Sequence, residues 1–353
     1  MDFLNGQLQV FLGPQENGAA DDLETVIVGF LDAAQFSLDV AVQEIDNPRI
    51  ADALERARRR FQPGSSPPRR LRVRLVTEGD YLCEERPLEP PTTPSDLDIN
   101  RQLLAQLMRG SIDAKIDFNP KIFHQKFIIR DAEKPGAAVL TGSANFTGTD
   151  THRNLNHVVI FHHDGVVTAY QTEFDQLQEG IFGARSPKLT NTNPFKFFLG
   201  TTEVQIAFSP DHNPELRIVN EILKAQTSAR LLMFTFAKST TIDDALRARL
   251  EVPGFTVRGV LDSSQSAHEW SPHPELIAAG ARLRRDTLPN QGKLHHKLLG
   301  RGRAGGDQRE LQLQGPANQY NDENLFIIRN ASVAQHFRAE VDRVFGQLAA
   351  DFA

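Results

Sequence analysis

Cysteine is almost absent from this chain of 353 residues, in which Cys83 stands alone. A single cysteine excludes an intramolecular disulfide, and so few thiols are typical of proteins kept in a reducing compartment. The sequence also lacks a run of about 18 apolar residues, the length that a membrane-spanning helix needs. Its first residues, 1–6, have neither the basic nor the apolar region of a signal peptide. We therefore expect a cytoplasmic protein.

A strong positive charge is also missing, because the formal net charge is -6. This balance argues against a protein that coats nucleic acid through bulk electrostatics, but it leaves room for a local basic groove. Two groups of basic residues occur, and each is either a solvated surface or a contact for a polyanion. The first group is Arg56, Arg58, Arg59, Arg60, Arg69, Arg70, Arg72 and Arg74, and the second is Arg282, Arg284, Arg285, Lys293, Arg301 and Arg303. The second group brackets one copy of the motif described next.

The sequence does contain a short pattern of histidine and lysine, and it occurs twice. His124 and Lys126 precede residues 127–129, which read as a buried strand, so their side chains project to the same face. An imidazole beside an ammonium suits a phosphate group, because the imidazole can attack or carry a proton while the ammonium neutralises charge. One copy alone is equally explained by a surface strand. His295 and Lys297 repeat the pattern, and chance explains two copies poorly.

The two copies resemble the signature of the phospholipase D superfamily, HxK(x)4D followed by GSxN, which that family has twice per active unit. The first copy matches throughout, with His124, Lys126, Asp131, Gly142, Ser143 and Asn145. The second copy retains His295, Lys297, Gly315 and Asn318, but Pro316 replaces the serine and Gly302 replaces the aspartate. Pro316 offers neither a hydroxyl nor a backbone donor. In the family the motif aspartate supports the fold, so the resemblance implies supporting roles for Asp131 and Ser143.

The order of expected elements repeats as well. Strands alternate with helices in each half, which predicts βαβ units and a sheet covered by helices. Two pairs of segments, 154–160 with 321–327 and 173–175 with 340–342, share one offset of 167 residues. We predict an α/β fold of two duplicated phospholipase D-like lobes, residues 1–185 and 200–353, each a mixed, mostly parallel sheet flanked by helices. The lobes would form a pseudo-dimer with one shared active site, in a monomer with an internal pseudo-two-fold axis.

The resemblance implies hydrolysis of a phosphodiester in two steps, without a metal or another cofactor. One histidine attacks phosphorus and forms a phosphohistidine, and the other protonates the leaving group and then activates water. Lys126 and Lys297 would neutralise charge, and Asn145 and Asn318 would donate hydrogen bonds to the phosphoryl oxygens. Neither copy of the motif shows the spaced carboxylates or cysteines that a metal needs.

The two histidines can be given different roles from the residue shortly after each GSxN, which in the family hydrogen-bonds a catalytic imidazole. Alignment of the two halves gives Asn156 for the first and Glu323 for the second. Because a carboxylate stabilises an imidazolium ion, His295 beside Glu323 suits a general acid and base. His124 beside the neutral Asn156, a supporting residue, suits the nucleophile.

The motifs do not fix the substrate, and three interpretations are open. The segment 142–149 and the sequence after it resemble the compact nuclease branch of the superfamily, so a nuclease acting on DNA or RNA is the first. A phospholipase D-type lipid phosphodiesterase is the second, since the 23 phenylalanines include candidates for contact with lipid. The third is a non-catalytic nucleic-acid-binding module with a degenerate second half.

Overall fold

The computed structural model describes residues 1–82, 96–119, 121–183, 194–238, 241–286, 292–302, 308–312 and 321–348. The chain packs into two compact units that are not continuous in sequence. Unit 1 comprises Met1–His152, His157–Pro187 and Tyr320–Asp322, and unit 2 comprises Arg153–Asn156, Lys188–Gln319 and Glu323–Ala353. Each unit therefore includes a short segment from the other half of the sequence. The predicted boundaries, 1–185 and 200–353, do not contain this exchange.

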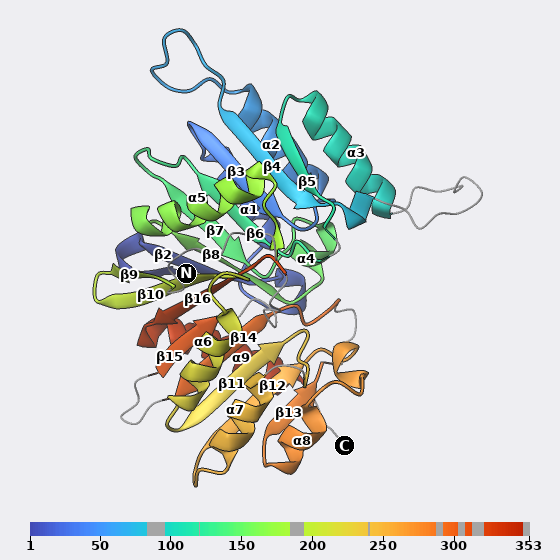
Figure 1. Ribbon diagram of the computed structural model, residues 1–353, viewed down its shortest axis with the longest axis vertical. Coiled ribbons are helices and arrows are strands. Elements are labelled where there is room, and N and C mark those ends of the chain that lie inside the picture. The colour runs from blue at the N-terminus through green and yellow to red at the C-terminus, as the bar shows by residue number, and fades with distance from the viewer. Residues whose placement is uncertain are drawn as a thin grey trace, which may run out of the picture. The chain divides into compact units, whose positions relative to one another are not determined.

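An eight-stranded mixed sheet forms the centre of unit 1 (Figure 1). In spatial order its strands are β1 (Asp2–Phe3), β2 (Leu8–Gly13), β8 (Asn156–Phe161), β7 (Ala138–Gly142), β6 (Lys126–Arg130), β3 (Ser37–Val42), β4 (Arg72–Glu78) and β5 (Asp113–Asp117). Its helices are α1 (Leu23–Asp32), α2 (Pro48–Arg59), α3 (Asp96–Arg109), α4 (Gly148–His152) and α5 (Asp164–Glu179). Strands β3, β4 and β5 are parallel, and β6 runs antiparallel to β3, so β6 begins where β3 ends. We call the end of the sheet marked by Val42, Glu78 and Lys126 the motif end of unit 1.

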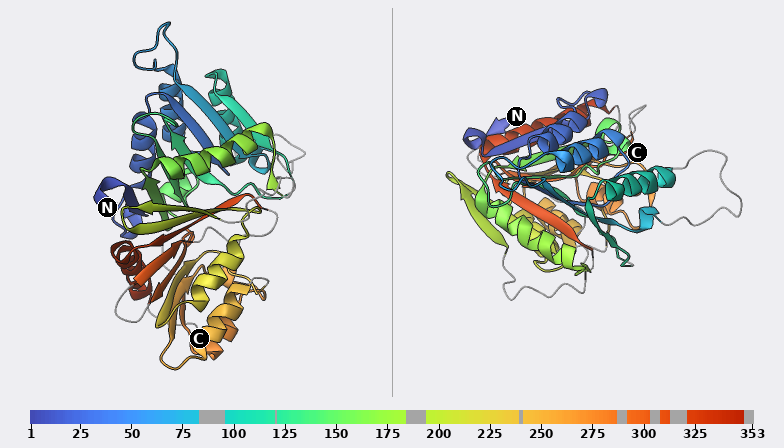
Figure 2. Two further views of the ribbon diagram at one scale, coloured as in Figure 1. Left: turned by 60° about the vertical axis from the view of Figure 1, so that its left-hand side comes forward. Right: turned by 90° about the horizontal axis from the view of Figure 1, so that it is seen from above.

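Helices cover both faces of this sheet, as the alternation of side chains along β6 shows. Ile128 belongs to the hydrophobic core that Leu54 of α2 shares. Phe127 points to the opposite face, where its ring meets Tyr170 and Phe174 of α5 edge to face, with centroids 5.0 and 6.4 Å apart. Figure 2 shows α5 on one side of the sheet and α1 and α2 on the other. Each large apolar side chain buried in these layers contributes about 1.5–3 kcal/mol.

Helix α2 shows how local sequence sets the ends of an element. Asn47 caps the helix by accepting a hydrogen bond from the backbone N–H of Arg49 at 2.9 Å, and Pro48 occupies the first helical position. The helix ends at Arg59, and three arginines lie in its last turn. From the sequence, Asn47-Pro48 predicts the start of a helix that runs to about Arg60, and the structure confirms this helix.

Unit 2 has a second eight-stranded sheet. In spatial order its strands are β9 (Phe195–Leu199), β10 (Thr202–Ser209), β16 (Glu323–Arg329), β15 (Gln308–Gln312), β14 (Lys297–Gly302), β11 (Ser228–Met233), β12 (Thr256–Leu261) and β13 (Arg282–Arg285). Its helices are α6 (Pro214–Leu223), α7 (Thr241–Leu250), α8 (His273–Ala278) and α9 (Ala331–Gln347). The motif end of unit 2 is marked by Met233, Leu261 and Lys297, which pair across β11, β12 and β14.

The two sheets have the same strand order, which confirms two duplicated α/β lobes. One feature of the prediction is wrong, because the sheets are mixed but not mostly parallel. The pairs within β3–β4–β5 and within β11–β12–β13 are parallel, whereas those within β6–β7–β8 and β14–β15–β16 are antiparallel. The physical reason is that β6 and β7 are joined by a connection too short for the crossover that parallel neighbours need. Among the described residues, no helix is long and apolar enough to cross a membrane.

Candidate functional site

The first motif begins strand β6 at the motif end of unit 1. Lys126 lies opposite Val42 of β3 and is 1% exposed. Its Nζ donates to the Gln43 side-chain oxygen at 3.1 Å and to the backbone oxygen of His124 at 3.0 Å. The ammonium is thus fixed beside its own histidine, in a place where water screens its charge weakly.

The backbone around His124 is held by residues that are distant in sequence. The His124 N–H donates to the backbone oxygen of Asp322 at 2.9 Å, within unit 1. The N–H of the preceding residue, Phe123, donates to the buried carboxylate of Glu78 at 2.7 Å. These bonds fix the imidazole's point of attachment to the sheet.

The GSxN segment of the first motif begins at Gly142, the last residue of β7, and is buried. The Ser143 hydroxyl lies 3.2 Å from Nδ1 of His157 and accepts a hydrogen bond from the His157 N–H at 3.1 Å. The Asn145 N–H donates to Asp150 at 2.7 Å, which anchors the turn before α4. Ser143 and Asn145 therefore follow the strand that neighbours β6, and Ser143 and His157 hold the loop together.

Asp131 stabilises the start of β3 with its carboxylate. Its oxygens accept hydrogen bonds from the backbone N–H groups of Gln35, Phe36 and Ser37 at 2.6–3.1 Å. The side chain is 3% exposed and lies at the far end of β6 from Lys126. In the structure Asp131 supports the fold and lies away from the motif end.

Gly302 takes over this task in the second motif with its backbone. The Gly302 carbonyl accepts hydrogen bonds from the N–H groups of Gln226 and Thr227 at 2.9 and 3.3 Å, directly before β11. A side chain has no room there, because a Cβ would lie 2.3 Å from Thr227 Oγ1 and 2.5 Å from Ser228 Oγ. The missing aspartate of the second motif is thus replaced by a carbonyl.

The second motif begins β14 in the same way. Lys297 is 3% exposed, and its Nζ donates to the His295 backbone oxygen at 3.4 Å and lies 3.4 Å from His295 Nε2. The His295 ring packs edge to face on Phe234 with centroids 5.0 Å apart. His296, between them in sequence, points away and lies 3.5 Å from Glu340 of α9.

Asn156 is the partner of His295, which corrects the prediction that it would accompany His124. Its Oδ1 lies 3.1 Å from His295 Nδ1. An amide oxygen only accepts hydrogen bonds, so with this assignment Nδ1 carries the hydrogen and Nε2 keeps a lone pair toward Lys297. The physical reason is the exchanged segment of unit 2, since Leu155 pairs with Leu294 and accepts the His295 N–H at 3.0 Å. The role given to His124 therefore loses its basis in Asn156, and the role given to His295 from Glu323 stays a prediction.

The remaining predicted residues are placed only in part. Glu323 begins β16 opposite Ser209 of β10 and is 3% exposed. Asn318 lies outside the described residues, as do Gly315 and Pro316. Among the residues that the structure does describe, no group of three or more His, Cys, Asp or Glu is placed to hold a metal ion.

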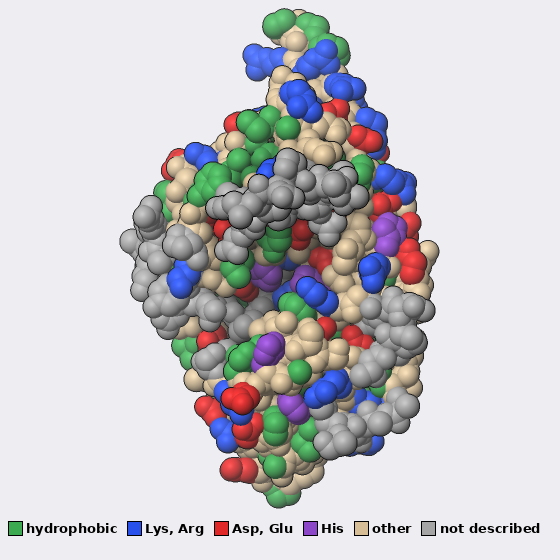
Figure 3. Space-filling view, turned by 90° about the vertical axis from the view of Figure 1, so that its right-hand side faces the viewer, with side chains coloured by type: hydrophobic (Ala, Val, Ile, Leu, Met, Phe, Trp, Pro, Cys, Tyr) green, Lys and Arg blue, Asp and Glu red, His purple; other side chains and the backbone are tan. Residues whose placement is uncertain are grey.

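The first basic group lies away from the motif end of unit 1. Arg72 begins β4, and β4 is parallel to β3, so the loop 60–71 lies at the opposite end of the sheet from Lys126. Figure 3 shows Lys and Arg side chains gathered at this end of unit 1, where Arg69 and Arg70 are exposed. In the second group, Arg285 ends β13 at the motif end of unit 2, and Lys293 lies 5.5 Å from the Phe234 ring.

Glu44 is a titratable residue near the motif that the sequence analysis missed. It follows β3 at the motif end of unit 1, and burial together with the charges of Asp46 and Asp150 raises its pKa to about 7. Lys126 opposes this shift, so the two charges lie within electrostatic reach. Its position just after the carboxyl end of a strand was the available signal, because ligand sites in α/β folds often lie there.

Replacing Glu44 by glutamine should stabilise the protein at alkaline pH. A glutamate whose pKa is about 4.5 in the unfolded protein and about 7 in the folded protein does not lower the free energy of unfolding below pH 4.5. The wild type then loses stability as the pH rises toward 7 and keeps the full loss above it. Urea unfolding should show Glu44→Gln more stable than wild type at pH 8, by on the order of 1–3 kcal/mol, and equal to it at pH 4.5.

The matched control is Glu179→Gln, which makes the same change of charge at an exposed position of α5. It should leave the change in the free energy of unfolding between pH 4.5 and pH 8 as it is in the wild type. An equal response of both variants would mean that Glu44 titrates as an ordinary surface glutamate.

Comparison with known proteins finds sequence similarity over part of this chain. A family model described as "Cardiolipin synthase, PLD-like domain" matches residues 27–178. The mitochondrial cardiolipin hydrolase of Xenopus laevis is 29% identical over 146 residues, which are 41% of this chain and 56% of that protein. A phospholipase D of Rickettsia conorii is 40% identical over 67 residues, 19% of this chain and 32% of that protein. The matched region thus spans about half the length of the first relative and a third of the second.

A solved structure resembles nearly the whole chain. The phosphatidylserine synthase of Haemophilus influenzae superimposes with a TM-score of 0.62 and 11% identity, over 98% of this chain and 87% of that one. At this identity the likeness shows the fold alone. The likeness of fold covers both lobes, whereas the family model matches residues 27–178.

Proposed function

We propose that this chain, which belongs to the phospholipase D superfamily, is a metal-independent phosphodiesterase that acts through a phosphohistidine. One observation carries the proposal, namely that the same local arrangement occurs in both lobes. Each HxK lysine is buried at the first position of the corresponding strand, and each donates to the backbone oxygen of its own histidine. A fold with no use for the second motif would have no reason to keep a desolvated ammonium there.

The reaction follows from these groups. One imidazole attacks phosphorus, a P–N bond forms, and the P–O bond to the leaving group breaks while the other imidazole gives that oxygen a proton. The second imidazole, now neutral, then takes a proton from water, which attacks phosphorus and releases the first. Lys126, Lys297, Asn145 and Asn318 balance the charge that develops on the phosphoryl oxygens, and Glu323 is the remaining carboxylate of the proposed site.

We infer that the substrate is a nucleic acid, which makes the enzyme a nuclease. The support lies at the motif end of unit 2, in the loop after β12, where Asp262 accepts the Leu294 N–H at 3.0 Å. In this loop Trp270 is 36% exposed and stacks on His268 with centroids 5.0 Å apart and planes 15° apart. An exposed flat aromatic pair offers a surface on which a base can stack.

Wild-type protein should hydrolyse single-stranded DNA or RNA in EDTA, and Trp270→Ala should raise KM for that substrate about tenfold. Loss of one base–aromatic stack costs ~1–3 kcal/mol, whereas a substrate without a base loses nothing. The readout is therefore the ratio of kcat/KM for an oligonucleotide to that for bis(p-nitrophenyl) phosphate. An unchanged ratio would mean that the loop after β12 does not contact the substrate.

A phospholipid is the second candidate, and two observations favour it. The relatives that match this chain are named as a cardiolipin hydrolase and a phospholipase D. Two exposed apolar side chains precede the first motif in sequence, Phe118 directly after β5 at 66% and Ile122 at 46% exposure. Turnover of cardiolipin or phosphatidylcholine that falls in Phe118→Ala, with no turnover of oligonucleotides, would select the lipid. If the wild type turned over no phosphodiester, the remaining interpretation would be a non-catalytic nucleic-acid-binding module.

A further inference from the structure

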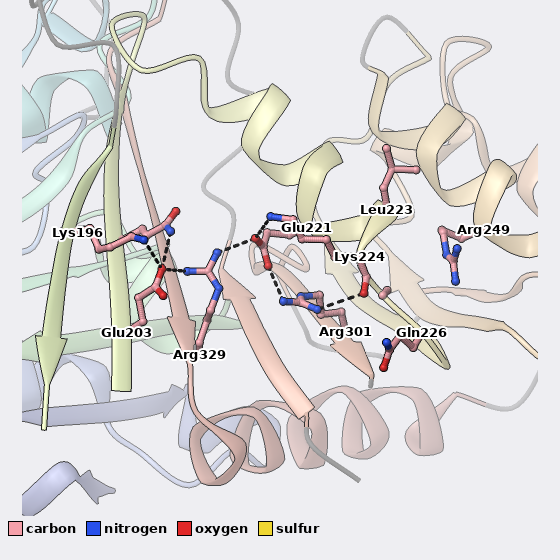
Figure 4. A pocket seen from close by; sticks show the side chains of 11 residues that line it. Lys196, Glu203, Glu221, Leu223, Lys224, Gln226, Arg249, Arg301 and Arg329 are labelled. Carbon is pink, nitrogen blue, oxygen red and sulfur yellow. Dashed lines mark hydrogen bonds and ion pairs between the residues drawn. The ribbon is translucent and has the colours of Figure 1, made fainter. Parts of the chain in front are cut away.

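Unit 2 contains a pocket of about 690 Å³ at the end of its sheet opposite the motif (Figure 4). It is lined by Lys196, Glu203, Gln205, Glu221, Leu223, Lys224, Ala225, Gln226, Arg249, Arg301 and Arg329. Arg301 and Lys297 both lie on β14, four residues apart, so roughly 13 Å of extended strand separates them. The pocket is therefore a separate place on the lobe, and no residue of the HxK motif lines it.

A network of ion pairs organises the pocket around one buried carboxylate. Glu221 of α6 is 3% exposed and receives Arg301 at 2.7 Å, Arg329 at 2.6 Å and Lys224 at 3.2 Å. Figure 4 shows these side chains converging on Glu221 from β14, β16 and the end of α6. Burial alone would raise the pKa of Glu221, but the neighbouring cations outweigh it and lower the pKa, so the carboxylate is ionised. The two guanidinium groups are thereby locked in position.

The pocket nevertheless carries more positive than negative charge. Five cationic side chains line it against two carboxylates, Glu203 and Glu221. Lys224 keeps 62% and Lys196 keeps 52% of its side chain exposed, so both reach solvent at the rim. The Nε of Arg249 is buried and has no hydrogen-bond partner among the described residues, while its guanidinium packs 4.9 Å from the Phe255 ring. The five cations and two carboxylates leave a net charge of +3, although Lys196, Lys224, Arg301 and Arg329 each contact Glu203 or Glu221.

The duplicated lobe shows that the fold itself does not require this cluster. Arg130 of β6 occupies the strand position of Arg301, and Phe30 of α1 occupies the helix position of Glu221. There the arginine stacks on the aromatic ring, 4.5 Å from its centroid, and its guanidinium donates to the backbone oxygen of Gly136 at 3.3 Å. Unit 1 thus satisfies the same packing with one cation and one apolar ring. The extra charges of unit 2 need a cause other than packing.

We propose that this pocket binds a small phosphorylated ligand, with the phosphomonoester dianion held by Arg249, Lys224 and the guanidinium groups that Glu221 orients. A dianion matches the net positive charge, and planar guanidinium groups match the geometry of phosphate oxygens. The volume lies in the range of small-molecule sites, about 300–1,000 Å³. The ligand is a second binding partner, distinct from the phosphodiester at the motif.

The test is calorimetric titration of the full-length protein with AMP and with inorganic phosphate. Arg249→Gln and the double variant Arg249→Gln/Lys224→Gln should weaken AMP binding about tenfold or more. The matched control is Arg247→Gln on the same helix, whose side chain pairs with Asp244 and does not line the pocket. It should bind AMP as the wild type does.

A second set of titrations distinguishes AMP binding in the pocket from AMP binding at the motif, and from binding of larger polyanions. Lys297→Met should leave AMP affinity within a factor of two, because the motif lies at the other end of β14. AMP binding that disappears in Lys297→Met and persists in Arg249→Gln/Lys224→Gln would overturn the proposal. So would a wild type that has no affinity for AMP or phosphate but whose binding to cardiolipin vesicles or to an oligonucleotide depends on Arg249 and Lys224.

Discussion

Replacing either His124 or His295 by alanine should lower the rate of bis(p-nitrophenyl) phosphate hydrolysis in EDTA by at least ~10³-fold. Each imidazole has its own task in the proposed reaction, attack on phosphorus or transfer of a proton, and neither task can pass to the lysine beside it. The double variant should be no slower than the slower single variant, because groups that act as a unit are not additive. The measurement is kcat/KM with and without chelator.

His163→Asn is the matched control for these variants. It also removes a histidine, but one that caps α5 by accepting the Val166 N–H, and asparagine preserves a cap. It should keep wild-type activity. Acid quenching during turnover and peptide mapping should then find the phosphoryl group on His124 or His295, which assigns the two roles. Full activity in either alanine variant would end the two-histidine mechanism.

Replacing Asp131 by alanine should destabilise the protein by about 3–5 kcal/mol and leave the chemistry intact. Three backbone N–H groups before β3 would lose their acceptor, and buried donors left unsatisfied cost ~1–3 kcal/mol each. Asp131→Asn keeps one side-chain oxygen and should lose less. Urea unfolding followed by circular dichroism gives the free energy, and kcat per folded molecule should match the wild type.

Gly302→Ala tests the corresponding connection of the second lobe, where the end of β14 meets the residues before β11. The new Cβ would meet the Thr227 and Ser228 hydroxyls, so this small substitution should also destabilise the protein.

Asp113→Ala, an exposed position at the start of β5, should stay within about 0.5 kcal/mol of the wild type. If Asp131→Ala proved stable but inactive, the carboxylate would belong to the reaction instead of the fold.

Much of the fold could be predicted because its signals are local. The helix at Pro48 has its cap and its proline within a few residues, and the strand after Lys126 is a short apolar run. The duplication was visible as a common offset between distant segments. The sheet directions were harder, since the position of a strand in a sheet depends on partners that its own residues do not name.

The pairing of Asn156 with His295 shows what a linear comparison of the halves leaves out. Aligning the repeats assigns each partner to the motif of its own half, which is correct only when each half folds on itself. The segment 153–156 instead runs beside residues 293–295 in unit 2. Glu44 was missed for a related reason, because its altered pKa comes from burial beside Asp46 and Asp150 and not from its neighbours in a motif.

The exchanged segments also limit how this protein can be divided. A fragment that stopped at residue 185 would leave the amide of His124 without the Asp322 carbonyl, and one that started at residue 200 would deprive His295 of the Asn156 amide oxygen. The two halves are therefore interdependent, because cutting the chain between residues 185 and 200 would remove from each unit a segment that the other half of the sequence supplies.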